Sequence, residues 1–323
     1  MRLKKYTNDD DLIWDAFVHD SVNGTLMQER NFLNYHPAGR FIDCSLLVYD
    51  SHDKLSAVIP AAHQRVGEKN IFSSYPGASH GGIVIGQKFK TADALTLIPL
   101  LINDCQTKGF KQIDLKPVPR IYHYRFCDEL DFALRYHGFF VSSTELATAL
   151  HLPENGPLKP TTENNTLRNI RKAAKLGVTI AESQDYQSYW DILSANLQER
   201  HESHPTHTLV EIKALTNRYP QAIKLFAAFY ENEMIGGVLT FLLNTRVVNC
   251  FYISHRAKYQ HLRPLNLLFH ELINWSREKG YKYLDWGIST ENKGKYVNQG
   301  LFSFKEGFGG RGVLRENYRC ELI

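Results

Sequence analysis

The chain has 323 residues, of which 43% are hydrophobic and 22% are charged. These proportions are those of an ordinary globular protein, and the length allows two domains that each bury a core. The formal net charge of +4 permits an acidic ligand without requiring one. The 14 His would raise this charge as the pH falls toward about 6.

Cysteine usage and the N-terminal residues narrow the class of protein further. The five Cys form no Cys-x-x-Cys pair, and several lie among apolar residues, so we expect reduced, buried thiols. The first residues, MRLKKYTNDDDLIW, are polar and lack the apolar centre of a signal peptide. Because no apolar run is as long as a membrane span, we expect a cytoplasmic protein without a transmembrane segment. The cysteines are Cys44, Cys105, Cys127, Cys250 and Cys320.

Short elements are predicted in the first half of the chain. A helix over Leu12–His19 is followed by a turn, and a second short helix, Asn31–His36, ends before Pro37. Two paired strands, a glycine-rich loop, a long amphipathic helix and a further strand come next. Their predicted bounds are Ser45–Tyr49, Ser56–Ala61, Tyr75–Gly82, Thr91–Lys108 and Lys108–Leu115.

A break in regular structure separates the two halves. Residues 151–160 contain three Pro and one Gly, which end helices and strands. We therefore expect a first domain over residues 1–155 and a second over residues 156–310. Helices in the second half are predicted over Leu167–Leu176, Gln187–His201, Leu209–Arg218 and Pro264–Lys279, and strands over Ala222–Tyr230, Gly236–Leu243 and Val247–Ile253.

Two segments of the second half repeat segments of the first. Lys279–Trp286 (KGYKYLDW) matches Lys108–Leu115 (KGFKQIDL), and each octet follows a predicted helix that ends in Lys-Gly. Upstream, Glu233–Leu239 resembles Asp53–Ile59, and both are typical of a tight turn between antiparallel strands. Either similarity alone could arise by chance between apolar strands. Because both occur in the same order, we predict a tandem duplication of one α/β (α+β) unit.

Near the C-terminus, Leu301–Gly310 (LFSFKEGFGG) places one lysine among Leu and Phe residues. An ammonium group is costly in apolar surroundings without a partner, and glycines allow a close backbone approach. We therefore expect Lys305 to face a cleft between the domains, with Phe304 and Phe308 excluding water around it. The alternative is a lysine whose stem packs on aromatic rings while its head reaches water.

A basic helix opens the second half. Arg168, Arg171, Lys172 and Lys175 have spacings of three and four residues, so they are neighbours on the helix surface. They could bind the phosphates of a charged tRNA, a nucleotide or coenzyme A. The alternative is a solvated helix face without a ligand.

Histidines gather after the following helix, at His201, His204 and His207. Their spacing alone would allow a metal site. No Cys or carboxylate completes a tetrahedral set in obvious register, so we expect no metal.

These motifs resemble the Fem (FemABX-like) family of peptidoglycan aminoacyltransferases, tandem-domain relatives of the Gcn5-related N-acyltransferases (GNAT). The resemblance covers nearly the whole chain. The most specific match is Gly300–Gly310, which is similar to the C-terminal signature of the family. Leu167–Val178 resembles the basic helix that opens the family's second domain. Gly24–Gln28 followed by Phe32 is a weaker match, and Gln198–His201 is similar to an Arg-bearing helix end.

The resemblance implies two tandem GNAT-like domains, each a mixed, mostly antiparallel sheet flanked by helices. It implies that a C-terminal tail, about residues 311–323, completes the sheet of the first domain. The implied activity is transfer of an aminoacyl or acyl group to an amine of a bacterial cell-envelope precursor, of peptidoglycan or polysaccharide. The donor would be an aminoacyl-tRNA or an acyl-coenzyme A-like thioester, with no permanently bound cofactor and no DNA partner.

The resemblance also implies roles for single residues. Lys305 would stabilise charge on the reacting carbonyl, beside the backbone of Phe304, as a fixed cation can. Arg200 would bind the phosphates of a nucleotide-linked acceptor. His36 stands where some members have a Lys, so the acceptor need not be the same sugar nucleotide. A general base would help the amine lose its proton, and the candidates are His36, His80, Asp114 and Asp285.

Two other functions stay open at this stage. One is an acyl-coenzyme A-dependent acetyltransferase that acts on a small amine or a sugar. Its pyrophosphate would be expected at Tyr259–Asn266, which contains no glycine, and this argues against ordinary coenzyme A binding there. The other is a non-catalytic ligand-binding module with the same fold.

Overall fold

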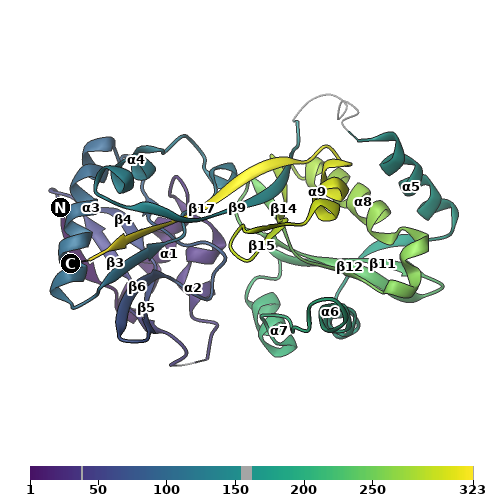
Figure 1. Ribbon diagram of the computed structural model, residues 1–323, viewed down its shortest axis with the longest axis horizontal. Helices are drawn as coiled ribbons and strands as arrows, with labels where there is room; N and C mark the ends of the chain where they lie inside the picture. The colour runs from purple at the N-terminus through teal and green to yellow at the C-terminus, as the bar shows by residue number, and fades with distance from the viewer. Residues whose placement is uncertain (38, 154–161, 323) are drawn as a thin grey trace. The chain divides into compact units, whose positions relative to one another are not determined.

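The computed structural model describes residues 1–37, 39–153 and 162–322, without the side chains of Arg200 and His201. The chain divides into two compact units. Unit 1 comprises Met1–Glu145 and Leu314–Ile323, and unit 2 comprises Leu146–Val313 (Figure 1). The boundary expected at residues 155/156 lies outside the described residues.

Unit 1 contains short strands interleaved with helices. Three 3-10 turns, η1 (Asn8–Asp10), η2 (Leu26–Gln28) and η3 (Arg120–Tyr122), connect them. The helices are α1 (Asp11–His19), α2 (Arg30–Leu33), α3 (Thr91–Thr107) and α4 (Glu129–Tyr136). The strands are β1 (Arg2–Lys5), β2 (Ile42–Asp43), β3 (Leu46–Tyr49), β4 (Leu55–Ile59), β5 (Ala61–Val66), β6 (Lys69–Ser74), β7 (Val84–Ile85) and β8 (Gln112–Leu115).

The strands of unit 1 form two ladders because Pro60 divides β4 from β5. Proline has no N–H to donate to a ladder. β4 belongs to an antiparallel sheet of order β1-β3-β4-β7, whereas β5 pairs with β6 in the run β8-β6-β5-β2. Within that run β6 and β8 are parallel. The buried core of the unit joins both ladders to α3 and α4 through Leu97, Leu101, Ile113 and other apolar residues.

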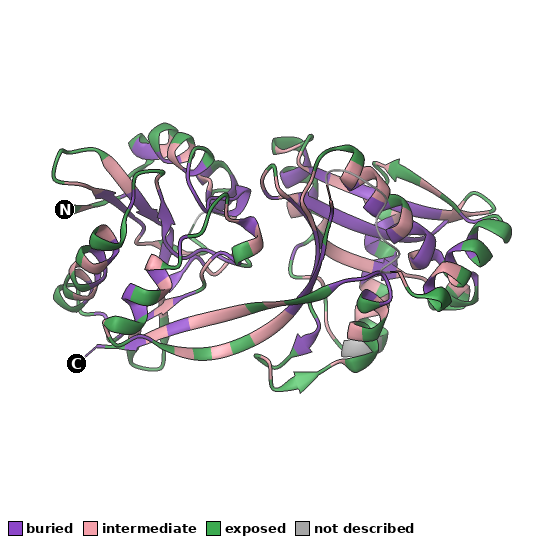
Figure 2. Cartoon of the chain, turned by 90° about the horizontal axis from the view of Figure 1, so that it is seen from above, coloured by how far each residue is buried: buried purple, intermediate pink, exposed green. Residues whose placement is uncertain are grey.

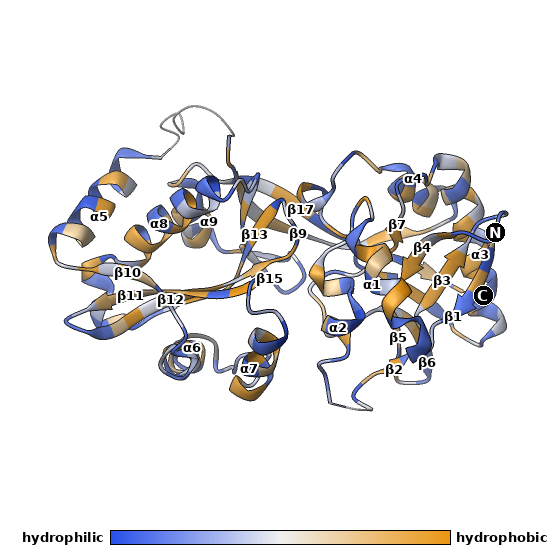
Figure 3. Ribbon diagram, turned by 180° about the vertical axis from the view of Figure 1, so that it is seen from behind, coloured by the Kyte–Doolittle hydropathy of each residue, from blue (hydrophilic) through white to orange (hydrophobic). Residues whose placement is uncertain are grey.

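Unit 2 is one larger sheet covered on both faces. Its helices are α5 (Asn164–Lys175), α6 (Tyr186–His201), α7 (Leu209–Arg218), α8 (Pro264–Glu278) and α9 (Gln299–Glu306), with a 3-10 segment η4 (Ala257–Leu262). Its strands are β10 (Thr179–Ser183), β11 (Ile223–Tyr230), β12 (Glu233–Leu242), β13 (Val247–His255), β14 (Tyr283–Ile288), β15 (Thr290–Glu291) and β16 (Tyr296–Val297). Figures 1 and 3 show α5 and α8 on one side of β11 and β12 and α6 and α7 on the other.

The sheet order in unit 2 is β10-β11-β12-β13-β14-β9. All neighbours are antiparallel except β13 and β14. β9 (Phe140–His151) begins in unit 1 and ends in unit 2, where its last residues pair with β14. Figure 2 shows that the central strands of this sheet are buried.

The C-terminal residues return to unit 1. β17 (Arg311–Glu321) starts in unit 2, and its residues Tyr318–Glu321 pair antiparallel with β8. The tail thus adds a strand to the ladder of unit 1. A bidentate ion pair from Arg319 to Asp114, with both N···O distances at 2.8 Å, fixes the register of that pairing.

The two repeated octets lie in equivalent strands. β8 follows α3 and pairs parallel with β6, and β14 follows α8 and pairs parallel with β13. In both units the last parallel pair contains the repeated aspartate, as Ser73–Asp114 in one and Asn249–Asp285 in the other. The second repeat also matches, since β4 and β12 each follow a tight turn in an antiparallel hairpin. This shared order is what a duplication produces.

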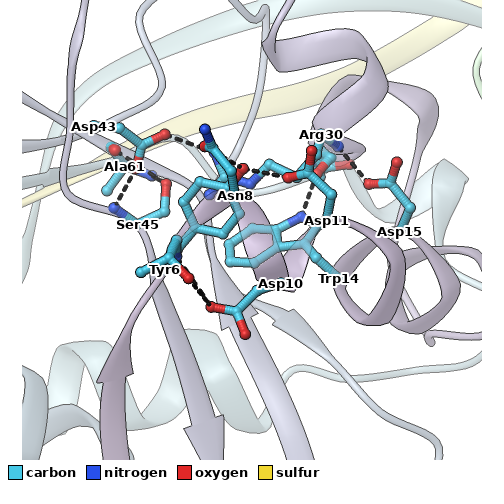
Figure 4. A network of polar contacts seen from close by, with 12 residues as sticks. Tyr6, Asn8, Asp10, Asp11, Trp14, Asp15, Arg30, Asp43, Ser45 and Ala61 are labelled. Carbon is cyan, nitrogen blue, oxygen red and sulfur yellow. Dashed lines mark hydrogen bonds and ion pairs between the residues drawn. The ribbon is translucent and has the colours of Figure 1, made fainter.

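A buried arginine organises the N-terminal part of unit 1 (Figure 4). Arg30 is 0% exposed and donates to Asp43 across 2.6 Å. Its guanidinium carbon lies 3.4 Å from the centre of the Tyr6 ring and 4.1 Å from that of Trp14. Backbone N–H groups at the start of α2 are capped by Asp15. This cluster fastens α1 and α2 to the strands beneath them.

Candidate functional site

The parallel strands β13 and β14 separate part-way along their length. They pair from Val247–Tyr283 to Asn249–Asp285, and β13 then continues to His255 without a further ladder partner on β14 among the described residues. Backbone groups along the edge of β13 therefore become available to another extended chain. Such a gap at the carboxyl ends of parallel strands is a usual place for a ligand.

A β-bulge marks the point of separation. On the other edge of β13, Cys250 pairs with Thr240 and Tyr252 pairs with Leu239, so Phe251 has no opposite residue. An extra residue bends the strand and turns its backbone groups away from the ladder. We call this separation of β13 from β14, with its bulge, the opening of unit 2; its backbone groups could hold an acyl carrier by hydrogen bonds.

Lys305 lies on α9, beneath the end of β14. Its side chain is buried, with 1% of the residue exposed, so Lys305 does not face bulk solvent. That it faces a cleft between the domains stays a prediction. Its Nζ donates to the carbonyl of Gly287 at 2.9 Å, to that of Ile288 at 3.0 Å and to Ser289 Oγ at 2.7 Å. The ammonium thereby holds the last residues of β14, which lie beyond its pairing with β13, and the residue that follows them.

Aromatic residues surround this lysine, as its sequence context suggested. The Phe304 ring lies 5.4 Å from that of Phe308 and 5.9 Å from that of Phe269. Gly310 completes the packing, because a Cβ there would lie 2.6 Å from Thr148 Cγ2 and 2.9 Å from the Lys305 carbonyl oxygen. The glycine-rich signature is thus a close-packing requirement next to Lys305.

Buried polar groups line the base of the opening. Asp285 is 0% exposed, accepts from the Gly287 N–H at 2.8 Å and accepts from Asn249 Nδ2 at 3.3 Å. Burial raises the pKa of the neighbouring Cys250 thiol well above its usual range; the Asp285 charge also raises it, and Lys305 lowers it. Cys250 is therefore an uncharged thiol at neutral pH. Asp285 fixes the turn after β14, which makes it a structural group in this conformation.

A tyrosine–histidine pair that sequence reasoning did not single out lies beside the bulge. The Tyr252 hydroxyl lies 2.8 Å from His207 Nδ1 and 3.3 Å from the His207 backbone N–H. The backbone N–H donates to the hydroxyl, and the tautomer of the imidazole decides which of the hydroxyl and Nδ1 donates to the other. Burial raises the pKa of Tyr252. Of these two residues, the sequence indicates only His207, as one of three clustered histidines.

The predicted basic face is exposed on α5. Arg168, Arg171 and Lys172 all lie on its outer side, while Ile170 and Ala173 face the core of unit 2. Arg168 Nη2 donates to Asn165 Oδ1 at 2.8 Å. The side chain of Arg200 lies outside the described residues, so the structure gives it no position relative to this face.

His36 lies in unit 1, in an aromatic cluster. Its ring centre lies 3.9 Å from that of Tyr35, with the two planes tilted by 37°, and 4.9 Å from that of Phe41 in an edge-on contact. Gly77 abuts the imidazole so closely that a Cβ there would overlap it. His36 therefore belongs to unit 1 and Lys305 to unit 2.

Two other candidate bases have structural partners. Asp114 is held in the bidentate pair with Arg319 described above, and its Oδ1 also accepts from Gln112 Nε2 at 2.9 Å. His80 is 2% exposed, and its Nε2 lies 3.1 Å from Thr25 Oγ1. Burial, with the charges of Arg315 and His123, lowers the pKa of His80 to about 3, so the ring is neutral in the folded protein.

His80 gives a prediction for stability against pH. Unfolded His binds a proton with a pKa near about 6.5, whereas folded His80 does so only at about 3. The unfolded state therefore gains a proton as the pH falls below about 6.5, and stability decreases by about 1.4 kcal/mol per pH unit from this group. The free energy of unfolding of His80→Gln should fall less between pH 6.5 and 5 than that of the wild type. An equal fall in both would contradict it, and the exposed His52→Gln is the control.

The equivalent gap in unit 1 is closed. Ser74 Oγ, just beyond the last β6–β8 pair, accepts from the N–H groups of Gly82 at 3.1 Å and Lys116 at 2.9 Å. Gly81 also donates to the Lys116 carbonyl at 2.9 Å. Gly82 has a φ of +68° and approaches Pro117 closely, which glycine alone tolerates easily. The glycine-rich loop thus bridges the two strands in unit 1, whereas unit 2 stays open.

The turn before α8 meets the requirement of a tight bend without glycine. Arg263 adopts the left-handed conformation, with a φ of +58°, and Pro264 begins the helix. Four cationic or titratable side chains lie in this turn, at Arg256, Lys258, His261 and Arg263. No set of three His, Cys, Asp or Glu that could hold a metal ion occurs in the described part of the chain. Within the same residues, no helix has the length and apolar character needed to cross a bilayer.

The chain is similar to known proteins in sequence over part of its length and in fold over all of it. Residues 161–296 match the model of the acetyltransferase (GNAT) domain. The structure of FemX is similar over 100% of this chain and 98% of its own, with a TM-score of 0.73 and 14% identity. The chain has a FemX-like, tandem GNAT fold. This confirms the predicted fold class.

Other solved structures share the FemX-like fold. The C-terminal domain of a protein described as a lysylphosphatidylglycerol synthetase, from Agrobacterium fabrum, has a TM-score of 0.61 and 10% identity over 97% of this chain and 92% of its own. A tandem GNAT protein from the clavulanic acid biosynthesis pathway has a TM-score of 0.55 and 9% identity over 100% and 98%. The search of curated protein sequences found no significant match.

Proposed function

We propose that the protein is an N-acyltransferase that moves an aminoacyl or acyl group onto an amine of a cell-envelope precursor. The observation that carries the proposal is the opening between β13 and β14, with its bulge at Phe251, inside the segment that matches the GNAT domain. An acyl carrier laid along the free edge of β13 would present its carbonyl to fixed backbone donors. Fixed donors of this kind stabilise the oxyanion that develops during transfer.

The donor would bind in unit 2 alone. Its gap is open, whereas the Ser74 bridge and the Gly81–Lys116 hydrogen bond close the equivalent gap in unit 1. Unit 1 would then serve the acceptor, with His36 as one of its binding residues. This division gives the two copies of one fold different tasks.

The class of acceptor is proposed from the resemblance and from the named structures. The Fem family modifies peptidoglycan precursors, and FemX and a lysylphosphatidylglycerol synthetase domain have this fold. From the resemblance to the Fem family, we propose an aminoacyl-tRNA as donor and an envelope molecule as acceptor. An acyl-coenzyme A-like thioester is the second candidate donor, since a GNAT model matches unit 2. We propose no resident cofactor, and a cytoplasmic site of action.

Lys305 and Phe304 enter the proposal as the residues that shape the reaction site. A direct role for Lys305 at the oxyanion requires Nζ to exchange one of its three acceptors for the reacting carbonyl. An indirect role requires only that Lys305 hold the end of β14 and Ser289 in place. Tyr252 and His207 could carry the proton that the amine loses, because a hydroxyl–imidazole pair can relay one proton.

The donor is identified by a direct comparison. Purified protein is incubated with a cell-wall nucleotide precursor and either a mixed pool of radiolabelled aminoacyl-tRNAs or acetyl-coenzyme A. The proposal expects label to reach the precursor's amine from the aminoacyl-tRNA pool. Transfer from acetyl-coenzyme A alone would instead support the acetyltransferase alternative, and specific binding without transfer would support the non-catalytic module.

The basic face of α5 gives a second prediction. Arg168→Gln, Arg171→Gln and Lys172→Gln should each flatten the salt dependence of binding to the donor tRNA. Each neutralised phosphate contact contributes a slope of about 0.7 to 0.9 in log affinity against log salt. Fluorescence titration at several salt concentrations measures the slope. Unchanged slopes in all three variants would mean that the face is only solvated, and exposed Arg120→Gln in unit 1 is the control.

A further inference from the structure

Exposed aromatic side chains gather in one part of unit 1. In the described residues, six aromatic side chains stand among the exposed large apolar groups, and five of them fall between residues 124 and 140. The sixth, Tyr296, lies in unit 2. The five are Tyr124 (41% exposed), Phe126 (92%), Phe132 (55%), Tyr136 (69%) and Phe140 (50%). We call these five residues the aromatic face.

The aromatic face is built from a turn, a helix and the start of a strand. Tyr124 and Phe126 lie in the turn between η3 and α4. Phe132 and Tyr136 are four residues apart on α4 and stack with centroids 5.8 Å apart. The opposite side of α4 already supplies Leu130, Ala133 and Leu134 to the core. The exposed rings of the aromatic face therefore lie outside the core of unit 1, and exposed apolar patches of this kind mark binding surfaces.

The charges around the aromatic face are nearly balanced. Three carboxylates near α4 are engaged within the protein: Asp128 by Arg120 at 3.0 Å, Glu129 by Arg125 at 3.5 Å, and Asp131 by the Tyr318 hydroxyl at 2.9 Å. This mixture of charges disfavours binding of a polyanion such as tRNA, because such a ligand binds a surface with a clear excess of positive charge.

Two further cations stand beside the projecting turn. Arg125 Nη2 donates to the carbonyls of Gln87 at 3.3 Å and Phe89 at 3.2 Å, so the segment that carries the exposed Lys88 and Lys90 lies against Arg125, the residue before Phe126. Neither lysine has an ion-pair partner among the residues that the structure describes. Lysines beside exposed aromatic rings suit a bilayer surface, because the ammonium groups attract anionic headgroups and the rings can enter the hydrocarbon below them.

We propose that the aromatic face is a membrane-docking surface that brings the enzyme to a lipid-linked acceptor. Phenylalanine at the tip of a turn can enter the acyl boundary of a bilayer, and tyrosine prefers the headgroup level. The bilayer deforms around a projecting ring, whereas a protein partner would need a pocket shaped to Phe126. The nature of the acceptor in this statement rests on the proposed function, but membrane binding itself does not.

Vesicle sedimentation of the full chain tests the proposal. The probes are vesicles of phosphatidylcholine and vesicles that also contain phosphatidylglycerol. We expect binding to both, with tighter binding to the second. Phe126→Ser and Phe132→Ser should each weaken the partition coefficient about tenfold, the scale expected for one buried phenyl ring. Lys88→Gln should weaken binding to the anionic vesicles alone.

Matched controls keep the result interpretable. Val210→Ser, at a residue 78% exposed in unit 2, should bind vesicles as the wild type does. Thermal midpoints should be unchanged, because the substituted rings are exposed. Absence of binding, or binding unaffected by both Phe variants, would overturn the proposal. So would loss of tRNA binding or of self-association in these variants in place of vesicle binding. Transfer to a soluble acceptor is measured in parallel, so failure of docking and failure of the proposed activity are separate outcomes.

Discussion

Lys305→Met should lower kcat by about two to three orders of magnitude while changing substrate affinity little. The size corresponds to the loss of one oxyanion-stabilising group, and the kcat-against-KM split follows because that charge exists only in the transition state. The substitution keeps the aliphatic stem but removes the ammonium that bonds Gly287, Ile288 and Ser289. Lys305→Arg should rescue incompletely, because a planar fork cannot occupy the place of a point charge.

Ser289→Ala separates the two roles that remain for Lys305. If Lys305 acts by holding the end of β14 and Ser289 in place, loss of the 2.7 Å hydrogen bond to Ser289 Oγ should also reduce kcat. If it acts directly on the oxyanion, the same variant frees one N–H, and kcat should be maintained. Full turnover in a folded Lys305→Met protein would refute both roles. Steady-state kinetics and thermal midpoints on the same preparations give the answer.

Asp43→Ala should be among the most destabilising single substitutions in unit 1. It leaves the fully buried Arg30 guanidinium without its carboxylate partner, and Nε and Nη2 of Arg30 already lack hydrogen-bond acceptors (Figure 4). Breaking a buried pair from one side costs about 3 kcal/mol, the lower end of the usual range, since the Asp43 side chain is 28% exposed. Urea denaturation measures the change.

Two further variants check the cause of that loss. Arg30→Met combined with Asp43→Ala removes the buried charge as well, so it should recover part of the lost stability. Glu321→Ala breaks the exposed Lys69–Glu321 pair and should change stability by less than about 1 kcal/mol. A double variant no more stable than Asp43→Ala would show that packing, not the uncompensated charge, sets the cost.

The order of elements could be predicted because their signals are local. Leu209–Arg218, for example, is a helix with the predicted bounds, and Thr208 caps it with Glu211. α4, β1 and β10 were not predicted, nor was the β5–β6 hairpin. In that hairpin Arg65 and Val66 face solvent, so its strands lack clear apolar alternation. Their pairing depends on partners distant in sequence, which a single strand does not encode.

The candidate site was predictable only in part. Lys305 was found because a lysine among aromatic residues is unusual in sequence, but its contacts with Gly287 and Ser289 lie 18 and 16 residues away. Leu301–Gly310 was interpreted as the wall of a cleft, which stays a prediction, and its residues Leu301–Glu306 are part of α9. The Phe251 bulge had no signal in the sequence, because a bulge arises from the register between two strands. Of the Tyr252–His207 pair, only His207 was noticed, as one of three clustered histidines.

The central claim is that the opening of unit 2 binds an acyl donor and supports transfer to an amine. Its most direct measurement is the mass of a peptidoglycan nucleotide precursor after incubation with the wild-type protein and a full set of aminoacyl-tRNAs. We predict a mass increase of one aminoacyl group, located on an amine by fragmentation and abolished or strongly slowed in Lys305→Met. The claim would be contradicted if a folded protein that binds the nucleotide precursor and the donor gave no mass increase with any aminoacyl-tRNA or acyl-coenzyme A.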